Sequence, residues 1–282
     1  MAKIFLINSY RDQKGLTLVE ILVALTLGLF VTATVLQIFL SSKRVYLTQE
    51  QNSGIQENGN FALEWLNKYI RITGYRNDPT IQNTYSFGNN DINACGQAIT
   101  LKEGQVIIGK DNVIDSVKGN YNSGCIIFRY RGNVDGSITD CFGTPVNNNA
   151  ETVINVFFLA FDQNINDWAL RCKSTTLSAN GSTVRTATFV NNVQDMQILY
   201  GTSTGTYLTA ANVTDWTNVV SVKIALLLSS ENNGVSVTNQ HQTYTYPPWP
   251  LSSNQPPVMV TANDFRLRRI FTTTINLRNQ TR

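Results

Sequence analysis

The longest hydrophobic stretch of the chain runs from Leu16 to Leu40 and is apolar apart from threonine, glycine, Glu20 and Gln37. Its 25 residues would extend roughly 37 Å as a helix, more than the ~30 Å hydrocarbon core of a bilayer. The pattern predicts a transmembrane helix over 16–40. Glu20 is the single charge in it. A charged side chain inside a membrane helix costs about 2.5 to 3.5 kcal/mol, so we expect Glu20 to have a function.

The helix is predicted to continue over 41–75, because this segment contains no proline and becomes hydrophobic on one side only. Such an amphipathic segment is expected to lie with one face on a sheet. Gly74 is the predicted end of the helix, and Pro79 prevents its resumption. Gly54 and Gly59 permit a kink. The predicted core face consists of Ile55, Ala62, Leu66, Tyr69 and Ile70, beside a second core-packing stripe of Phe61, Trp65 and Tyr69.

The rest of the chain, 76–282, predicts a β-rich globular domain, which makes the fold class α+β. Residues 76–97 are rich in asparagine and are expected to form a loop. Short apolar or alternating runs separated by polar turns then predict a series of strands. These strands are expected at 106–108, 113–117, 126–130, 153–161, 168–172, 184–190, 193–200, 219–228 and 267–277.

Two hairpins are predicted among these strands. The run 153–161 is long and apolar enough for a central strand, and 168–172 is its expected partner across a polar turn. The runs 184–190 and 193–200 are joined by two asparagines, which tolerate left-handed turn geometry. We therefore expect the second pair to form a hairpin as well.

A polar segment at 229–263 contains Y-P-P-W-P and two further prolines, so it is not expected to be in a sheet. Trp249 lies between prolines and is either an exposed docking feature or folded back onto its own domain. The basic group Arg266, Arg268 and Arg269 follows this segment. We expect a solvated or subunit-facing edge there, with phosphate binding as the alternative.

The composition fits an exported protein, since only 15% of the residues are charged and the net charge is +3. The chain as a whole has no strong excess of basic residues, and no nucleic-acid partner is expected. The cysteines are Cys95, Cys125, Cys141 and Cys172, which permit three disulfide connectivities. We favour Cys95 with Cys125 and Cys141 with Cys172, which closes loops of about 30 residues, each bond contributing roughly 3 to 4 kcal/mol.

No catalytic or metal-binding arrangement is apparent. G-x-S-x-G, H-E-x-x-H and phosphate-binding glycine loops are absent from the sequence. His241 is the only histidine and no C-x-x-C occurs, which disfavours zinc. The carboxylates of Asp111 and Asp115 are of a kind found in any loop-rich domain. We therefore expect no enzymatic activity, no cofactor and no metal.

The residues before the hydrophobic stretch read K-G-L-T-L-V-E, with Gly15 followed by Leu16 and then by Glu20 at the fifth position. This arrangement resembles the type III signal of type IV prepilins and pseudopilins. The resemblance implies that a prepilin peptidase removes the leader 1–15 by cutting between Gly15 and Leu16, and that Leu16 becomes N-methylated. The new amine and Glu20 would form an ion pair, within one helix or between neighbouring subunits, and set the register of a filament.

Four later segments resemble the PilW family of type IV pilus minor pilins. They are G-Y-R at 74–76, V-Q-D-M-Q-I-L-Y-G at 193–201, Trp216 followed by V-V-S-V-K-I-A-L-L-L, and the ending R-L-R-R-I-F-T-T-T-I-N-L-R-N. The resemblance implies a long N-terminal helix packed on a periplasmic globular domain. It also implies a minor pilin that helps to initiate pilus assembly, with other minor pilins, the major pilin and the inner-membrane assembly platform as partners, and incorporation near the pilus tip.

The expected location is the inner membrane, with residues 16–40 in the bilayer and the globular domain in the periplasm. The leader carries Lys3, Arg11 and Lys14 against Asp12, which favours a cytoplasmic leader and leaves the processed chain at +3 − 2 = +1. Two other functions share these features. One is a minor pseudopilin of the J class in type II secretion, and the other is a membrane-anchored periplasmic module that binds DNA or an adhesive ligand.

Overall fold

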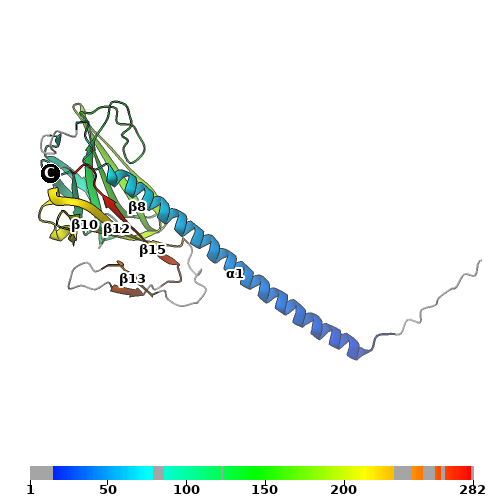
Figure 1. Cartoon of the computed structure of the whole chain (residues 1–282). Coiled ribbons are helices and arrows are strands. Elements are labelled where there is room, and N and C mark those ends of the chain that lie inside the picture. Colours follow the sequence, from blue (N-terminus) through cyan, green and yellow to red (C-terminus); the bar gives the residue numbers. More distant parts are fainter. Residues whose placement is uncertain are drawn as a thin grey trace, which may run out of the picture. The chain divides into compact units, whose positions relative to one another are not determined.

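The computed structural model describes residues 15–78, 86–121, 123–231, 243–249, 258–261 and 264–280. The chain divides into two compact units, Met1–Leu47 and Thr48–Arg282. One helix, α1 (Leu18–Arg71), begins in the first unit and ends in the second, and a β-rich globular domain follows it (Figure 1). The fold is therefore α+β, as the sequence predicts. Pro79 and His241 lie outside the described residues.

In the second unit, α1 presents one face to the domain. Its buried residues are Ile55, Gly59, Ala62, Leu66, Tyr69 and Ile70, spaced by three or four positions along the helix. The helix is continuous through Gly54 and Gly59, where the sequence permits a kink. Past its end, Gly74 adopts φ +74° and its N–H donates to the carbonyl of Arg129 over 2.9 Å. Gly74 thus supplies the left-handed residue expected at this helix terminus.

The larger sheet is antiparallel, with strand order β3-β6-β7-β8-β9. β7 and β8 form the predicted hairpin, with Phe161 opposite Trp168 and Asp162 opposite Asp167. β6 and β7 are almost entirely buried, so this sheet contributes much of the core. The strands are β3 (Ile107–Lys110), β6 (Cys125–Arg131), β7 (Thr152–Asp162), β8 (Asp167–Ser178) and β9 (Gly181–Asn191).

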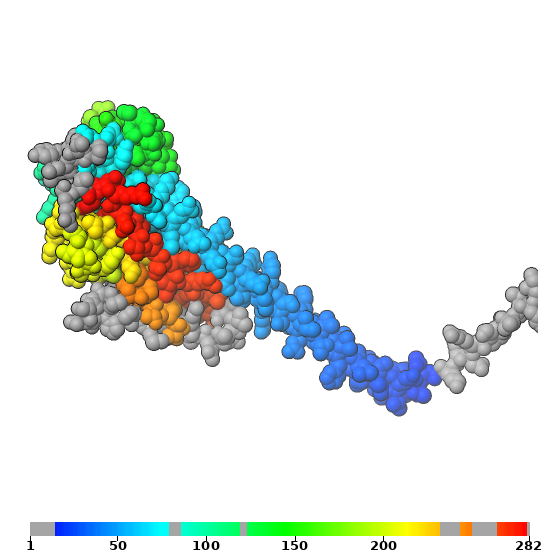
Figure 2. Space-filling view, viewed as in Figure 1, coloured from blue at the N-terminus to red at the C-terminus, as the bar shows by residue number. Residues whose placement is uncertain are grey.

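The second sheet has the order β11-β10-β12-β15, also antiparallel. Residues of α1 and of both sheets form one hydrophobic core. β15 is an edge strand, and Figure 2 shows this C-terminal strand, in red, against the light-blue second part of α1. The strands are β10 (Val193–Thr202), β11 (Tyr207–Leu208), β12 (Val219–Ser229) and β15 (Arg268–Asn276), and the 3₁₀ helices η1 (Ala210–Asn212) and η2 (Trp216–Asn218) precede β12.

The predicted hairpin of 184–190 with 193–200 is wrong. β9 pairs with β8, whereas β10 pairs with β12 in the other sheet. Asn192, at φ +59°, marks the point where the chain leaves one sheet for the other. β10, six of whose ten residues are buried, gains more by pairing with β12, which is buried along most of its length, than with β9, whose first six residues are exposed.

Among the described residues, three two-stranded ladders accompany these two sheets. The ladder within 90–101 contradicts the loop predicted at 76–97, because residues 90–94 form a strand. The ladder between 243–246 and 258–261 contradicts the expectation that 229–263 lies outside any sheet. Its paired residues flank the prolines instead of including them. The ladders are β1 (Asn90–Ala94) with β2 (Gln97–Leu101), β4 (Val113–Asp115) with β5 (Gly119–Tyr121), and β13 (Thr243–Tyr246) with β14 (Val258–Thr261).

Candidate functional site

Thr17 caps the start of α1. The helix begins at Leu18, and the Thr17 side-chain oxygen accepts a hydrogen bond from the Glu20 N–H over 3.3 Å. The Thr17 carbonyl accepts from the Ile21 N–H over 3.2 Å. Thr17 and Glu20 have the T-x-x-E spacing of a capping box, a signal that was present in the sequence and not used in predicting the site.

The two residues at the predicted cleavage point are accessible. Leu16 is 69% exposed, and a Cβ placed on Gly15 would meet no atom within 4 Å. A cut between them leaves Thr17 in place, so the capped first turn survives and the new amine lies one residue before the cap. Glu20 occupies that first turn, where the positive end of the helix dipole stabilises a carboxylate.

The hydrophobic half of α1 is uncovered. Every residue from Leu16 to Leu40 is exposed, and an 18-residue window here has a mean hydropathy of 2.3 with none of it buried. Length and composition are those of a membrane-spanning helix. Hydroxyl groups in this stretch are satisfied locally, because Thr26, Thr32 and Thr34 donate to carbonyls three or four residues earlier, over 2.8–3.1 Å.

The other half of α1 is fastened to the domain by close packing. A Cβ on Gly59 would lie 2.3 Å from Phe271 Cζ, so the absence of a side chain admits the ring of β15. Trp65 stacks on Tyr69 and packs against Phe189 of β9, with centroids 5.3 and 5.2 Å apart. Tyr69 is fully buried. Core packing is thus the role of this aromatic stripe, although Phe61 remains 38% exposed.

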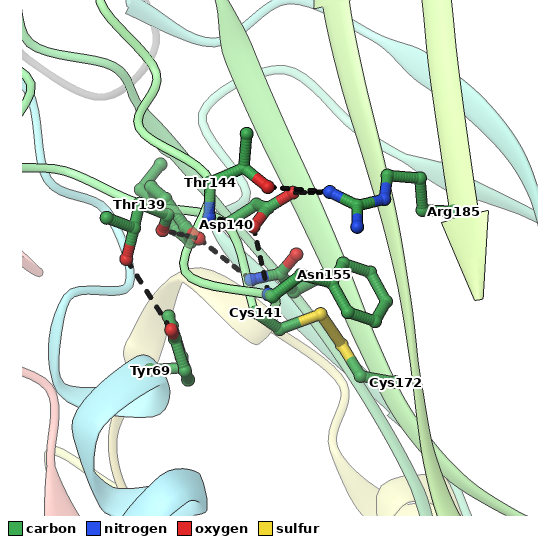
Figure 3. The surroundings of a disulfide bond; sticks show 10 residues. Tyr69, Thr139, Asp140, Cys141, Thr144, Asn155, Cys172 and Arg185 are labelled. Atoms are coloured by element: carbon green, nitrogen blue, oxygen red, sulfur yellow. Dashed lines mark hydrogen bonds and ion pairs between the residues drawn. A yellow bond between two sulfur atoms is a disulfide. The ribbon is translucent and has the colours of Figure 1, made fainter. Parts of the chain in front are cut away.

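The Cys141–Cys172 disulfide attaches the loop between β6 and β7 to β8 (Figure 3), with Cα atoms 6.7 Å apart. The Asp140 carboxylate accepts from the N–H groups of Phe142 and Thr144, over 2.9 and 2.8 Å. Arg185 of β9 lies 3.9 Å from Asp140 and donates to the Thr144 hydroxyl. The loop is therefore held to both β8 and β9.

The same loop reaches the end of α1. The hydroxyls of Tyr69 and Thr139 are 3.5 Å apart (Figure 3). Tyr130 donates to the Thr139 carbonyl over 2.8 Å and accepts from Asn155 at the same distance. Burial raises the pKa of Tyr130 well above its ordinary value, so this hydroxyl stays protonated. The loop thus contacts the helix end as well as the sheet.

Cys95 and Cys125 form the other disulfide and join the β1–β2 hairpin to β6, with Cα atoms 6.2 Å apart. The connectivity is the sequential one favoured from the sequence. Arg129 strengthens the same attachment. It is fully buried and donates to the carbonyls of Gln105, Gly88 and Lys102. Burial lowers its pKa to about 10. Sequence reasoning missed Arg129, because its carbonyl partners come from a segment far away in the chain.

β15 is an edge of its sheet, as expected, but the expectation that the arginines there are solvated is wrong for Arg266 and Arg268. Arg266 forms an ion pair with Asp167 over 2.6 Å, and the Arg268 side chain, 6% exposed, pairs with Asp264 over 2.5 Å. Alternation places both arginines on one side as expected, but carboxylates of the same domain face that side. Charge pairing then offsets part of the cost of the lost hydration. Arg269 is exposed.

Trp249 is folded back onto its own domain. Its side chain is 6% exposed. Trp249 and Tyr246 pack on Leu199, Ala225 and Leu227 and so cover the outer face of the second sheet. Of the two roles left open from the sequence, the structure favours packing.

The two carboxylates noted in the sequence also have local roles. Asp111 accepts from the backbone N–H groups of Ala210 and Ala211, over 2.9 and 2.8 Å. Asp115 accepts from Val117, Lys118 and Phe161. Within the described part of the chain, no three His, Cys, Asp or Glu side chains come together to hold a metal.

Comparison with known proteins identifies two regions of the chain. Residues 156–279 match the family model described as type IV pilus-assembly protein W. Residues 10–36 match the prokaryotic N-terminal methylation motif. A solved type IV-like pilin from Thermus thermophilus shares 13% identity, covering 80% of this chain and 97% of that one, with a TM-score of 0.48. Among curated proteins, none matched.

Proposed function

We propose that this chain is a PilW-type prepilin-like minor pilin that takes part in initiating the assembly of a type IV pilus, a proposal supported by the matches over 156–279 and 10–36. Its partners in this proposal are other minor pilins, the major pilin and the inner-membrane assembly platform. The match of 156–279 to the pilus-assembly family supports a pilus role over a secretion role.

The observation that carries the proposal is the combination of an uncovered hydrophobic helix with a carboxylate in its first turn. Such a helix requires an apolar environment, which is lipid before assembly and other helices within a filament. Subunits can therefore be stored in the membrane and drawn into a bundle.

Processing is proposed to occur between Gly15 and Leu16 by a prepilin peptidase, followed by methylation of Leu16. The accessible position of both residues and the independent cap at Thr17 support this site. The proposed organisation is a leader at 1–15, a membrane and filament-core helix at 16–40, an amphipathic continuation at 41–75 and a periplasmic domain at 76–282. The two disulfides suit that oxidising compartment.

Glu20 is proposed to fix axial register by pairing with the Leu16 amine of the same or a neighbouring subunit. A carboxylate surrounded by hydrocarbon gains little until it meets a cation, so misaligned helices are penalised. A single buried polar contact of this kind specifies register more than it stabilises the assembly.

The first test of this proposal is the intact mass and N-terminal sequence of the protein from its native membrane, together with pilus counts in a strain that lacks it. We expect a chain beginning with methylated Leu16 and a loss of pili. A chain that still begins at Met1 or is cut elsewhere, or unchanged pilus numbers, would contradict the proposal.

The second test is Glu20→Ala in the complemented strain. We expect normal membrane insertion and cleavage with few pili, because the register contact is lost. The matched control is Glu57→Ala, which removes an exposed carboxylate from the same helix and should leave pilus numbers unchanged. Wild-type piliation in the Glu20 variant would remove the register role.

A further inference from the structure

A cleft of about 630 Å³ lies where the β7–β8 hairpin, β10 and β13 meet. This volume is within the range of small-molecule sites, roughly 300 to 1,000 Å³. Its lining combines aromatic rings with a few polar groups, instead of the uniform apolar surface of a packing defect. The cleft is far in the sequence from the processing and register residues, and the proposed assembly role does not use it.

A β-bulge places two consecutive polar side chains in this cleft. In the β10–β12 ladder, Val193 pairs with Leu228 and Asp195 pairs with Leu227, which leaves Gln194 as an extra residue. Val193 and Met196 on either side are buried in the core. Gln194 and Asp195 therefore share the outer face of the strand, and both line the cleft. Bulges commonly redirect side chains in this way beside functional sites.

Aromatic side chains form the walls. Phe161 and Trp168 are opposite one another at the end of the β7–β8 hairpin and meet edge to face, with centroids 5.8 Å apart. Both are only half-buried. Tyr244 and Tyr246, alternate residues of β13, also line the cleft, and Tyr246 is fixed by its hydrogen bond to the Ala225 carbonyl over 2.9 Å.

The charges of the cleft balance. Lys118 Nζ lies 4.2 Å from the centroid of the Phe161 ring, so this cation contact is already made within the chain. Arg266 neutralises Asp167, and Arg268 pairs with Asp264 and donates to Gln194 Oε1 over 2.7 Å. The remaining charges of the lining are Lys118 and the Asp195 carboxylate, which accepts from the Met196 N–H and the Gln197 amide. Lys118 would repel a cationic ligand and Asp195 would repel an anionic one. The cleft therefore favours a neutral ligand.

We propose that this cleft binds a pyranose sugar, with Trp168 as the stacking surface and with Asp195 and Gln194 as hydrogen-bonding groups. A neutral sugar ring presents C–H groups on one face and hydroxyls at its rim. The C–H face can pack on an aromatic ring, and the hydroxyls can form hydrogen bonds with the adjacent carboxylate and amide groups. The sugar belongs either to the cell wall or to an external glycan, two sources with the same chemistry.

Ligand-observed saturation-transfer NMR tests the proposal on the full-length protein in lipid nanodiscs, prepared without glycoside detergents that would compete. The probes are the methyl glycosides of glucose, galactose, mannose and N-acetylglucosamine. We expect at least one to bind with Kd of about 1 mM or below. Peptidoglycan fragments and β-galactoside oligosaccharides then distinguish the two sources. Binding of either that is stronger than binding of the methyl glycosides supports the proposal.

Variants locate the binding in the cleft. Trp168→Ala and Asp195→Asn are each expected to weaken binding at least tenfold, whereas Trp168→Phe, which keeps a ring and guards against misfolding, retains part of it. The controls are Tyr207→Ala and Asp91→Asn, which change an exposed ring and an exposed carboxylate elsewhere and should bind as wild type. Absence of binding by every probe, or undiminished binding in both cleft variants, would overturn the proposal.

Discussion

Glu20 and Asp195 show how differently two carboxylates can be placed in one chain. Glu20 is exposed at the first turn of a hydrophobic helix, with its N–H held by Thr17. Asp195 is enclosed in the cleft beside β10, where it accepts from the Met196 N–H over 2.7 Å and from the Gln197 amide. Burial raises the pKa of Asp195 to about 6 by removing water from the charged form. These hydrogen bonds oppose the shift without cancelling it.

This raised pKa predicts a dependence of stability on pH. The folded state holds the Asp195 proton more tightly than the unfolded state, where the pKa is 3.8. Ionisation above pH 6 therefore destabilises the fold, and the contribution of this residue to stability increases as the pH falls from about 6 to 4. Asp195→Asn should raise the free energy of unfolding by up to about 2 to 3 kcal/mol at pH 7.5.

Denaturant unfolding of wild type and Asp195→Asn at pH 7.5 and 4.5 checks this prediction. Most of the difference between the two proteins should disappear at the lower pH, because wild-type Asp195 is then protonated in the folded state. Asp91→Asn, at an exposed position of β1, should show no such change. An equal gap at both pH values would mean that Asp195 is not destabilised by its burial.

At the scale of elements, α1 is one helix with two kinds of surface. Its first half is hydrophobic all round and uncovered, and its second half buries a single face whose members recur every three or four residues. Two glycines in the second half differ in what surrounds them. A Cβ on Gly54 would have no atom within 4 Å, whereas one on Gly59 would overlap the ring of Phe271.

Gly59→Ala is therefore expected to destabilise the domain relative to Gly54→Ala. In the open site, alanine should gain up to about 1 kcal/mol from its better helix propensity. At Gly59 the ring of Phe271 must move, and overpacking of this kind costs roughly 1 to 3 kcal/mol. Thermal unfolding of both variants measures the difference. If the Phe271→Leu background does not remove the stability difference between the two glycine variants, the contact between α1 and β15 is not the cause of that difference.

At the scale of the whole domain, the disulfides join segments that the sheet ladders leave separate. Cys95–Cys125 fastens the β1–β2 hairpin to β6, and Cys141–Cys172 fastens the β6–β7 loop to β8. Neither bond closes a short turn, since the sequence separations are 30 and 31 residues. Each should therefore restrict the unfolded chain substantially.

Replacing Cys141 and Cys172 together by serine should lower the free energy of unfolding by about 3 kcal/mol. For a domain of this size the corresponding fall in Tm is roughly 6 to 12 °C. Reductant should lower the Tm of the wild type further, because it also opens Cys95–Cys125. A melting temperature that is the same with and without reductant would show that the disulfides do not stabilise the domain.

Local patterns determined the helix, its two surfaces and the residues at its start. Gly15, Leu16 and Glu20 could be predicted as processing and register residues because they lie within six consecutive positions of the sequence. The β7–β8 hairpin could also be predicted, since its strands are adjacent and joined by a short polar turn. In each case the interacting residues are close in the chain, so periodicity and turn chemistry are sufficient.

Tertiary structure alone decided the contacts between distant segments. Adjacent strands β9 and β10 belong to different sheets because β10 buries its surface against β12. Arg266 finds Asp167, and Arg129 finds the carbonyls of a separate loop. The bulge that brings Gln194 and Asp195 into one cleft depends on the register with β12. The free energy of these contacts comes from burial and charge pairing across the fold, which the sequence pattern of one segment does not contain.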